Sequence, residues 1–103
     1  MIKTFGPNNL KPSKLCFGTM QFGDGASEKD SQEMYLKCRE NEINFFDTAY
    51  VYTKGLSEKI LGKLIKEERE KLLVVTKAGS EGGADSKNLR NQLEESLKRL
   101  DQD

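Results

Sequence analysis

Lys71-Leu72-Leu73-Val74-Val75-Thr76 is a short, continuous apolar run, and it decides the fold class. A run of this kind is typical of a strand that is buried on both faces of a parallel sheet. Two further strands are predicted upstream, over residues 14–20 and residues 43–46, and a helical pattern follows each of the three strands. Alternating strands and helices predict right-handed parallel βαβ units, and therefore an α/β fold.

Each predicted helix has one apolar face. Ser27 and Ser57 stand where the first and second helices would begin, and both are candidate N-caps. The apolar stripes consist of Met34, Tyr35 and Cys38 in the first helix, Ile60, Leu61, Leu64 and Ile65 in the second, and Leu89, Leu93, Leu97 and Leu100 in the third. One-sided patterns of this kind predict helices that pack one face against the sheet.

Length and composition restrict the chain to one small domain of 103 residues. Residues 1–13, rich in turn-forming Gly, Pro and Asn, predict a hairpin region, and residues 14–103 predict three βα units. Equal numbers of basic and acidic residues, 17 of each, argue against a nucleic-acid partner. No apolar stretch approaches the roughly 20 residues of a membrane helix, and no secretory leader is recognisable. We therefore expect a cytoplasmic protein with no membrane partner.

The chain has two cysteines, Cys16 and Cys38, and no histidine. Two cysteines are too few for a disulfide scaffold or a structural zinc site, so we expect no bound metal. The simplest interpretation is that both thiols are buried and reduced. Without histidine, the chain cannot form a Ser-His-Asp or Cys-His site from its own residues.

The polar residues that follow the predicted strands are the candidates for chemistry, because parallel sheets bind ligands at the carboxyl ends of their strands. Asp47 directly follows the second strand, Tyr52 lies five positions later, and Lys77 ends the third strand. In adjacent parallel strands, Asp47 and Lys77 would lie side by side. The carboxylate would then hold the lysine, and the ammonium would stabilise a tyrosinate during acid catalysis.

Each of these residues also has a simpler explanation. Asp47 could cap a turn, Tyr52 could pack on a helix as a loop aromatic, and Lys77 could extend from a strand end into solvent. Their spacing alone does not decide between the two interpretations. The glycine-rich segment at residues 79–83 matches neither the dinucleotide-binding fingerprint nor a P-loop, so it is better interpreted as a flexible loop.

Five segments, in order along the chain, carry a resemblance to a known family. They are Gly18-Thr19-Met20, residues 43–52 with the pattern Asp-Thr-Ala-x-x-Tyr, residues 57–62 with Ser-Glu-x-x-Leu-Gly, Val74-Val75-Thr76-Lys77, and the helical residues 93–100. In this order and at this spacing they resemble the aldo-keto reductases over nearly the whole chain. The resemblance implies a (β/α)8 barrel capped by an N-terminal hairpin, of which this chain would supply the hairpin and about three of the eight βα units.

The resemblance also implies NADP(H)-dependent reduction of an aldehyde or ketone to an alcohol. Tyr52 would donate the proton to the developing alkoxide. Lys77 would favour the tyrosinate form of Tyr52, and Asp47 would pair with Lys77.

The cofactor would contact the strand ends, according to the same resemblance. Its nicotinamide half would lie along the backbone of Gly18, Thr19 and Met20, together with Asp47.

Three departures from the family pattern stand out. Thr53 and Glu42 occupy positions where the family usually has glycine, and Glu42 at a left-handed helix end would cost about 1 kcal/mol. More seriously, the family's catalytic histidine and the residues that grip the cofactor's 2′-phosphate come later in the barrel than Asp103. We therefore expect a truncated chain that is inactive by itself.

Two other functions remain open at this stage. The chain could be a non-catalytic binding or assembly module that docks on another chain through its open barrel edge, or a regulator that senses NADP(H). Unpaired sheet edges favour self-association or a complementary chain. The resemblance implies a small carbonyl compound as the substrate. Substrate selectivity in the family comes from later loops of the barrel.

Overall fold

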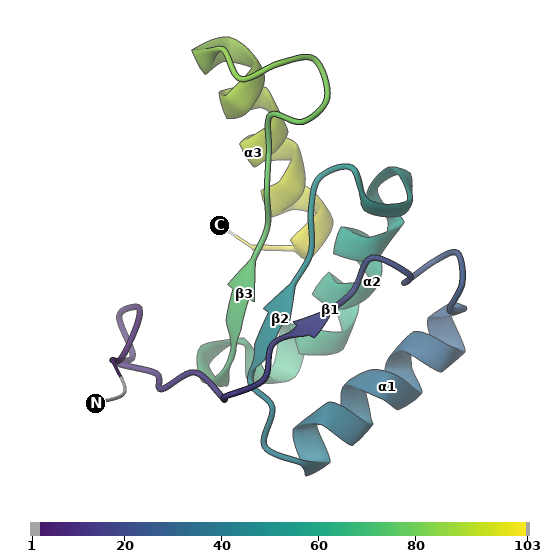
Figure 1. Cartoon of the computed structure of the whole chain (residues 1–103), viewed down its shortest axis with the longest axis vertical. Helices are drawn as coiled ribbons and strands as arrows, with labels where there is room; N and C mark the ends of the chain where they lie inside the picture. The colour runs from purple at the N-terminus through teal and green to yellow at the C-terminus, as the bar shows by residue number, and fades with distance from the viewer. Residues whose placement is uncertain (1–2, 103) are drawn as a thin grey trace.

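A computed structural model of the chain describes residues 3–102. The elements, in chain order, are β1 (Phe17–Gly18), α1 (Glu28–Glu40), β2 (Phe45–Asp47), the 3-10 helix η1 (Tyr52–Gly55), α2 (Leu56–Ile65), the 3-10 helix η2 (Lys66–Lys71), β3 (Leu73–Val75) and α3 (Ser86–Leu100) (Figure 1). The three strands form one parallel sheet in the order β1-β2-β3. The predicted α/β fold with parallel strands is therefore confirmed.

The register of the sheet brings the carboxyl ends of the strands to one edge. Gly18 pairs with Asp47, and Asp47 pairs with Val75. Because neighbouring parallel strands end at the same side, the loops that follow β1, β2 and β3 converge there. The pairing of these last strand residues thus fixes the position of any site that the loops form.

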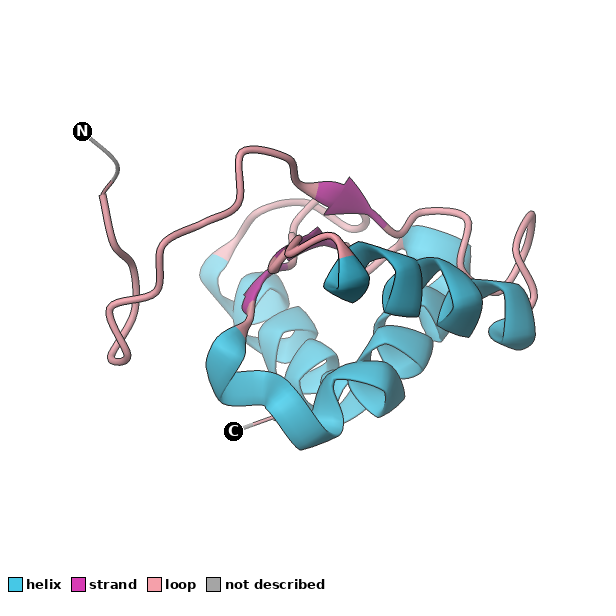
Figure 2. Ribbon diagram, turned by 90° about the horizontal axis from the view of Figure 1, so that it is seen from below, coloured by secondary structure: helices cyan, strands magenta, loops and turns pink. Residues whose placement is uncertain are grey.

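The core lies between the sheet and the helices, which gather on one side of the strands (Figure 2). Phe46 in β2 and Leu61 in α2 are fully buried, and Tyr35 of α1 packs on Phe46 with 5.3 Å between ring centroids. Tyr35, Cys38, Ile60, Leu61 and Ile65 are all buried in this core. The predicted apolar stripes of the first two helices are confirmed.

Helix α1 has the N-terminal cap that its sequence predicts. The hydroxyl of Ser27 accepts a hydrogen bond from the amide of Asp30 at 3.1 Å, and the Asp30 carboxylate accepts one from the amide of Ser27. This reciprocal pair satisfies amides that the first helical turn leaves without partners.

The other end of α1 confirms the expectation for Glu42. Glu42 has a φ of 61°, in the left-handed region. Its amide donates to the carbonyl of Arg39 at 3.1 Å, and the amide of Ile43 donates to the carbonyl of Cys38 at 2.9 Å. These two bonds form a Schellman motif, the helix ending in which glycine is the favoured residue at this position.

The expected cap of the second helix is wrong. Helix α2 begins at Leu56, its N-cap is Gly55 with a φ of 96°, and Ser57 lies inside the helix. The amide of Ser57 donates to the hydroxyl of Thr53 at 2.8 Å, so a neighbouring threonine does the capping. Ser57 does not cap because its own hydroxyl is fully buried and engaged with the loop that follows β1.

The predicted burial of β3 on both faces is also wrong. Leu72 is buried, but Val75 is 42% exposed. Strand β3 is an edge strand, and among the described residues nothing packs over the face of the sheet that points away from the helices. Cys16 points to this same open face, because it alternates with Phe17 of the core. It is exposed rather than buried as expected, whereas Cys38 is buried.

The leucine stripe of α3 is only partly buried. Leu100 joins the core, whereas Leu93 is 51% exposed and Leu89 is 37% exposed. The buried positions of this helix are instead Gln92, Ser96 and Leu100. The stripe runs beyond the end of the short strand β3, so no apolar partner within residues 3–102 covers its N-terminal half.

The predicted hairpin region forms one tight turn. Phe5 and Leu10 make an antiparallel bridge with amide-to-carbonyl distances of 2.8 and 2.9 Å. The first two residues of the predicted region lie outside the described residues. No helix in residues 3–102 has both the length and the apolar character that a membrane crossing requires.

Candidate active site

The predicted catalytic residues meet at the carboxyl edge of the sheet. Asp47 ends β2, and Lys77 lies two residues beyond Val75, the last residue of β3. The Lys77 ammonium forms an ion pair and hydrogen bond with Oδ1 of Asp47. Both side chains remain accessible, at 47% and 39% exposure, so the pair faces the space above the open side of the sheet.

Tyr52 completes this group. Its ring lies 4.8 Å from Nζ of Lys77, measured to the ring centroid. The hydrogen bond to Asp47 raises the pKa of Lys77, against a smaller lowering by burial, and Tyr52 adds to the rise. The lysine therefore stays a cation at neutral pH, beside the ring of Tyr52. A cation in this place stabilises negative charge on the phenol oxygen.

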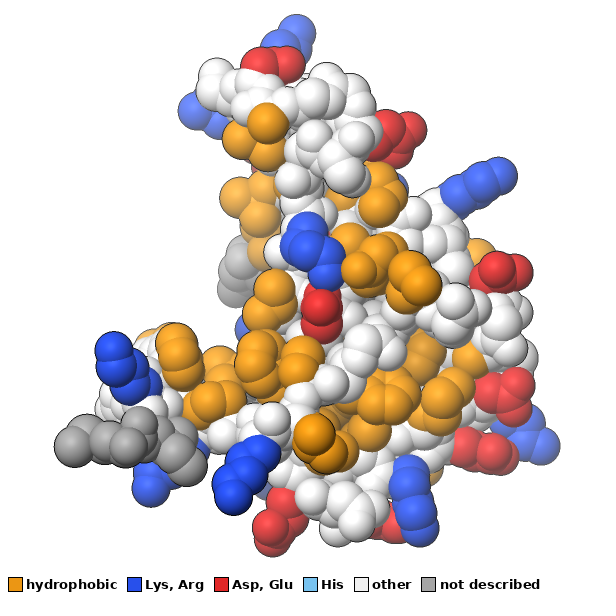
Figure 3. Space-filling model, in the orientation of Figure 1, with side chains coloured by type: hydrophobic (Ala, Val, Ile, Leu, Met, Phe, Trp, Pro, Cys, Tyr) orange, Lys and Arg blue, Asp and Glu red, His pale blue; other side chains and the backbone are white. Residues whose placement is uncertain are grey.

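The open face around this group is largely apolar. Val75, which pairs with Asp47, is 42% exposed, and Met20 is 53% exposed. Figure 3 shows a basic group in contact with an acidic group in the middle of this side of the molecule, with hydrophobic side chains around them. A charged pair bordered by apolar surface suits a substrate that has a polar reacting group on an apolar body.

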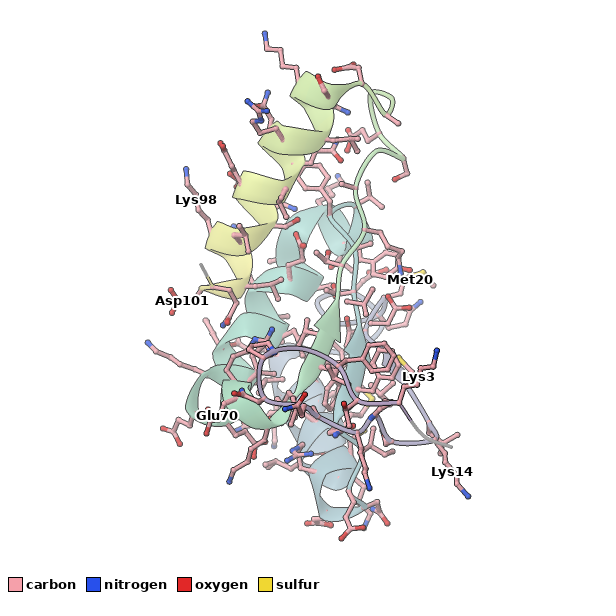
Figure 4. All side chains as sticks on the ribbon, turned by 90° about the vertical axis from the view of Figure 1, so that its left-hand side faces the viewer. Lys3, Lys14, Met20, Glu70, Lys98 and Asp101 are labelled. Atoms are coloured by element: carbon pink, nitrogen blue, oxygen red, sulfur yellow. The ribbon has the colours of Figure 1, made fainter. Side chains whose placement is uncertain are left out.

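The residues expected to contact a cofactor divide into two kinds. Gly18 and Met20 are exposed, and a Cβ built on Gly18 would meet nothing within 4 Å. Met20 extends from the side of the molecule (Figure 4). The space beside Gly18, next to Asp47 in the sheet, is therefore open.

Thr19, by contrast, is fully buried. Its amide and its hydroxyl both donate to the carbonyl oxygen of Asp47, at 2.9 and 3.0 Å. Its side chain therefore fixes the loop that follows β1 and is not accessible to a cofactor.

A cluster of buried hydroxyls lies beneath the site, and the sequence analysis did not find it. The hydroxyl of Ser57 lies 2.8 Å from those of Thr19 and Thr48 and donates to the carbonyl of Thr19 at 2.7 Å. All three residues are fully buried. Thr19 and Thr48 each come one residue after a strand, and this repeated strand-end threonine is the signal that could have revealed the cluster.

The carboxylate of Glu58 was missed as well. Glu58 is fully buried, and it accepts hydrogen bonds from Arg99 at 3.0 Å and from the hydroxyl of Thr76 at 2.7 Å. Arg99 also pairs with Glu95, four residues earlier on α3, at 3.7 Å. The Arg99 side chain is only 13% exposed, because it turns inward to Glu58.

The loop that carries Tyr52 is bent by left-handed residues. Thr53, Lys54 and Gly55 have φ values of 49°, 55° and 96°. Positive φ is unfavourable for a β-branched residue, which explains why glycine would suit the position of Thr53. The Thr53 hydroxyl compensates by donating to the carbonyl of Phe22 at 2.8 Å, which links the loops after β1 and β2.

Comparisons with known proteins place these features in context. The family model described as "Aldo/keto reductase family" matches residues 14–103. A probable voltage-gated potassium channel subunit beta from Arabidopsis thaliana is 36% identical over 111 residues, which cover 98% of this chain and 34% of that protein. The uncharacterized oxidoreductase YrpG from Bacillus subtilis is 37% identical over 116 residues, which cover 95% of this chain and 36% of that protein.

A solved structure is similar in fold over the whole chain. The aldo-keto reductase AKR11C1 from Bacillus halodurans, in its holo form, superposes with a TM-score of 0.81 at 29% sequence identity, covering 100% of this chain and 38% of that one. The chain thus spans about a third of the length of the curated relatives it matches. The parallel strands and helices described above correspond to part of a (β/α)8 barrel.

Proposed function

Because the chain belongs to the aldo/keto reductase family, we propose that it carries part of an oxidoreductase site that reduces an aldehyde or ketone to an alcohol with NADP(H). The observation that supports this most directly is the Lys77–Asp47 ion pair beside the ring of Tyr52. A phenol, a cation and a carboxylate in this order can deliver a proton to an oxygen that gains negative charge.

In the proposed reaction, Tyr52 is the general acid. The O–H bond of its phenol breaks, and the proton passes to the carbonyl oxygen of the substrate. Lys77 stabilises the resulting phenolate, and Asp47 holds the ammonium in place by its hydrogen bond. When bound, NADP(H) supplies the hydride that the carbonyl carbon receives.

The proposed cofactor contacts follow from exposure. Gly18, Met20 and Asp47 border the open space at the strand ends and are the residues that would hold the nicotinamide end. Thr19 supports them from below through its bonds to the Asp47 carbonyl. The structure of the Bacillus halodurans relative in a holo form is consistent with a cofactor in such a site.

The 103-residue chain by itself is proposed to be inactive. It has no histidine that could act beside Tyr52 and Lys77. We also propose a cytoplasmic location, because both cysteines are free thiols. Recovery of the protein in a periplasmic or secreted fraction would contradict that location.

A chimera tests the proposed chemistry. Residues 14–103 would replace the matching part of the Bacillus halodurans reductase, and NADPH oxidation would be followed with 4-nitrobenzaldehyde. We expect turnover by the chimera and a loss of about 10²- to 10⁴-fold in Tyr52→Phe, the range for removing a general acid. Tyr35→Phe is the matched control, because Tyr35 lies in the core and should leave turnover in place. A Tyr52→Phe chimera that is folded and as active as its parent would contradict the assignment.

A binding or assembly function is the second candidate. It is favoured by the open face of the sheet, on which Val75 is exposed, and by the exposed apolar residues Leu15 and Leu93 elsewhere on the chain. In this alternative the chain docks on another polypeptide through its open barrel edge, and the site residues serve no turnover. A second polypeptide in fixed stoichiometry with the native protein would support this function, and a protein that is always recovered alone would count against it.

A further inference from the structure

A closed circuit of hydrogen bonds lies behind the end of β3. The amide of Tyr50 donates to the carbonyl of Lys77 at 3.0 Å. The hydroxyl of Thr76, the residue before Lys77, donates to Oε2 of Glu58 at 2.7 Å. Arg99 donates to Oε1 of Glu58 at 3.0 Å and to the carbonyl of Tyr50 at 2.7 Å, which closes the circuit.

The guanidinium of Arg99 packs closely against Tyr50 and Gly55. It lies over the ring of Tyr50, with 4.3 Å from Cζ to the ring centroid. A Cβ built on Gly55 would approach Cζ to 2.7 Å, so a side chain at that position would displace the arginine. Both bonds come from the same nitrogen, Nη1 of the guanidinium. Nη1 stands one bond further from the backbone than a lysine ammonium would, so a lysine here would not place its nitrogen between the same two acceptors.

Two residues near Arg99, Lys98 on α3 and Asp101 at its C-cap, differ from it in side-chain direction. Lys98 and Asp101 point away from the body of the molecule (Figure 4), whereas the Arg99 side chain is 13% exposed and its partner Glu58 is fully buried. A buried carboxylate is costly unless it is paired and hydrogen-bonded. The bonds with Thr76 and Tyr50 satisfy this pair, and they also tie it to the strand end of Lys77 and to the loop of Tyr52.

We propose that Glu58 and Arg99 are positioning residues, which fix the loop of Tyr52 against the strand end of Lys77. Both segments are tied to the same buried pair, one through Tyr50 and the other through Thr76. The two segments also bond directly, from the Tyr50 amide to the Lys77 carbonyl at 3.0 Å, and the side chain from α3 adds a second tie that limits how far the Tyr52 ring can move from the Lys77 ammonium. The importance of this geometry for catalysis rests on the proposed function, but the geometry can be measured without it.

The test uses nuclear magnetic resonance on the labelled full chain. In the parent protein, the Tyr52 ring should shift the Lys77 ε-protons upfield and give a nuclear Overhauser effect to them, because Nζ lies 4.8 Å from the ring centroid. Arg99→Lys and Glu58→Gln should each lose most of both signals. Arg99→Lys keeps the charge, so it is the variant to use if Glu58→Gln does not fold.

Two controls separate positioning from general destabilisation. Lys98→Gln removes a charge from the neighbouring residue, and Arg39→Lys weakens another part-buried ion pair, the one with Glu68 at 2.8 Å. Both controls should keep the Lys77 shift and the contact to Tyr52. The proposal is overturned if folded Arg99→Lys protein keeps both signals, or if the parent protein lacks them. Because the readout needs no cofactor, a failure of the chimera to reduce carbonyls leaves this result unaffected.

Discussion

At the end of α1, Glu42 holds a backbone conformation that is unfavourable for a residue with a side chain. Glu42 was expected at a left-handed helix end, and its φ of 61° confirms this. The position of Ser57 could not be read in the same way, because a serine beside a helix start looks like a cap from sequence alone. Only the three-dimensional approach of Thr19 and Thr48 reveals that its hydroxyl belongs to a buried cluster.

At Glu42, replacement by glycine should stabilise the protein. Glu42→Gly relieves the left-handed strain and should raise the free energy of unfolding by about 1 kcal/mol. Urea unfolding followed by circular dichroism measures the change. Glu40→Gly is the control, since Glu40 is the last residue of α1 and does not have a positive φ. There glycine should lower the stability by about 0.5–1 kcal/mol. Equal losses in both variants would show that the backbone at residue 42 is not strained.

At the scale of elements, the existence and order of strands and helices could be predicted. Which of their faces are buried by neighbouring elements could not. The apolar run at residues 72–75 predicted β3, and its parallel pairing with β2 is confirmed. Whether the outer face of that strand is buried depends on what lies across it, and periodicity carries no information on that. The Asp47–Lys77 contact was predictable because strand ends converge in parallel sheets, whereas the link from Glu58 to Arg99 joins helices whose relative rotation the sequence does not specify.

The contact between α1 and η2 predicts a dependence of stability on pH. Burial alone would raise the pKa of Glu68, but hydrogen bonds from Tyr35 and Arg39 outweigh it and hold the pKa below the ordinary value of 4.5. A carboxyl group whose pKa is lower in the folded state stabilises the protein above its unfolded pKa, and this contribution is lost as the pH falls through the folded pKa.

The comparison of the parent protein with Glu68→Gln isolates this effect. At pH 7 the parent should unfold at a higher urea concentration than Glu68→Gln, and the difference should shrink as the pH falls below about 4.5. Glu67→Gln, a neighbouring exposed position, should show no comparable difference. A parent advantage that stays constant from pH 7 to pH 3 would refute the assignment to Glu68.

At the scale of the whole molecule, the dominant feature is the asymmetry between its two faces. One face of the sheet is covered by helices, and the other leaves side chains such as Cys16 and Val75 in contact with water. The edges of β1 and β3 carry backbone groups that are free to pair with another chain. Surfaces of this kind favour association.

We therefore expect the purified chain to self-associate in a concentration-dependent way. Sedimentation equilibrium measures the mass, and Leu93→Glu on the exposed stripe of α3 should weaken the association. Leu36→Glu is a matched control, because Leu36 on α1 has the same 51% exposure as Leu93 but lies on a different helix. A chain that stays monomeric at all concentrations and melts in one sharp transition would contradict the expectation.

The three proposed catalytic side chains all come from residues 47–77, whereas the arginine that secures them comes from α3. The loop-closure entropy of a contact grows with the separation of its partners along the chain, which is 30 residues for Asp47 and Lys77 and 49 residues for Tyr50 and Arg99. During folding, Asp47, Tyr52 and Lys77 can therefore meet before Arg99 reaches the loop of Tyr52. The site would exist first as a loose encounter of three side chains, and it would gain its fixed geometry only when the last helix arrives.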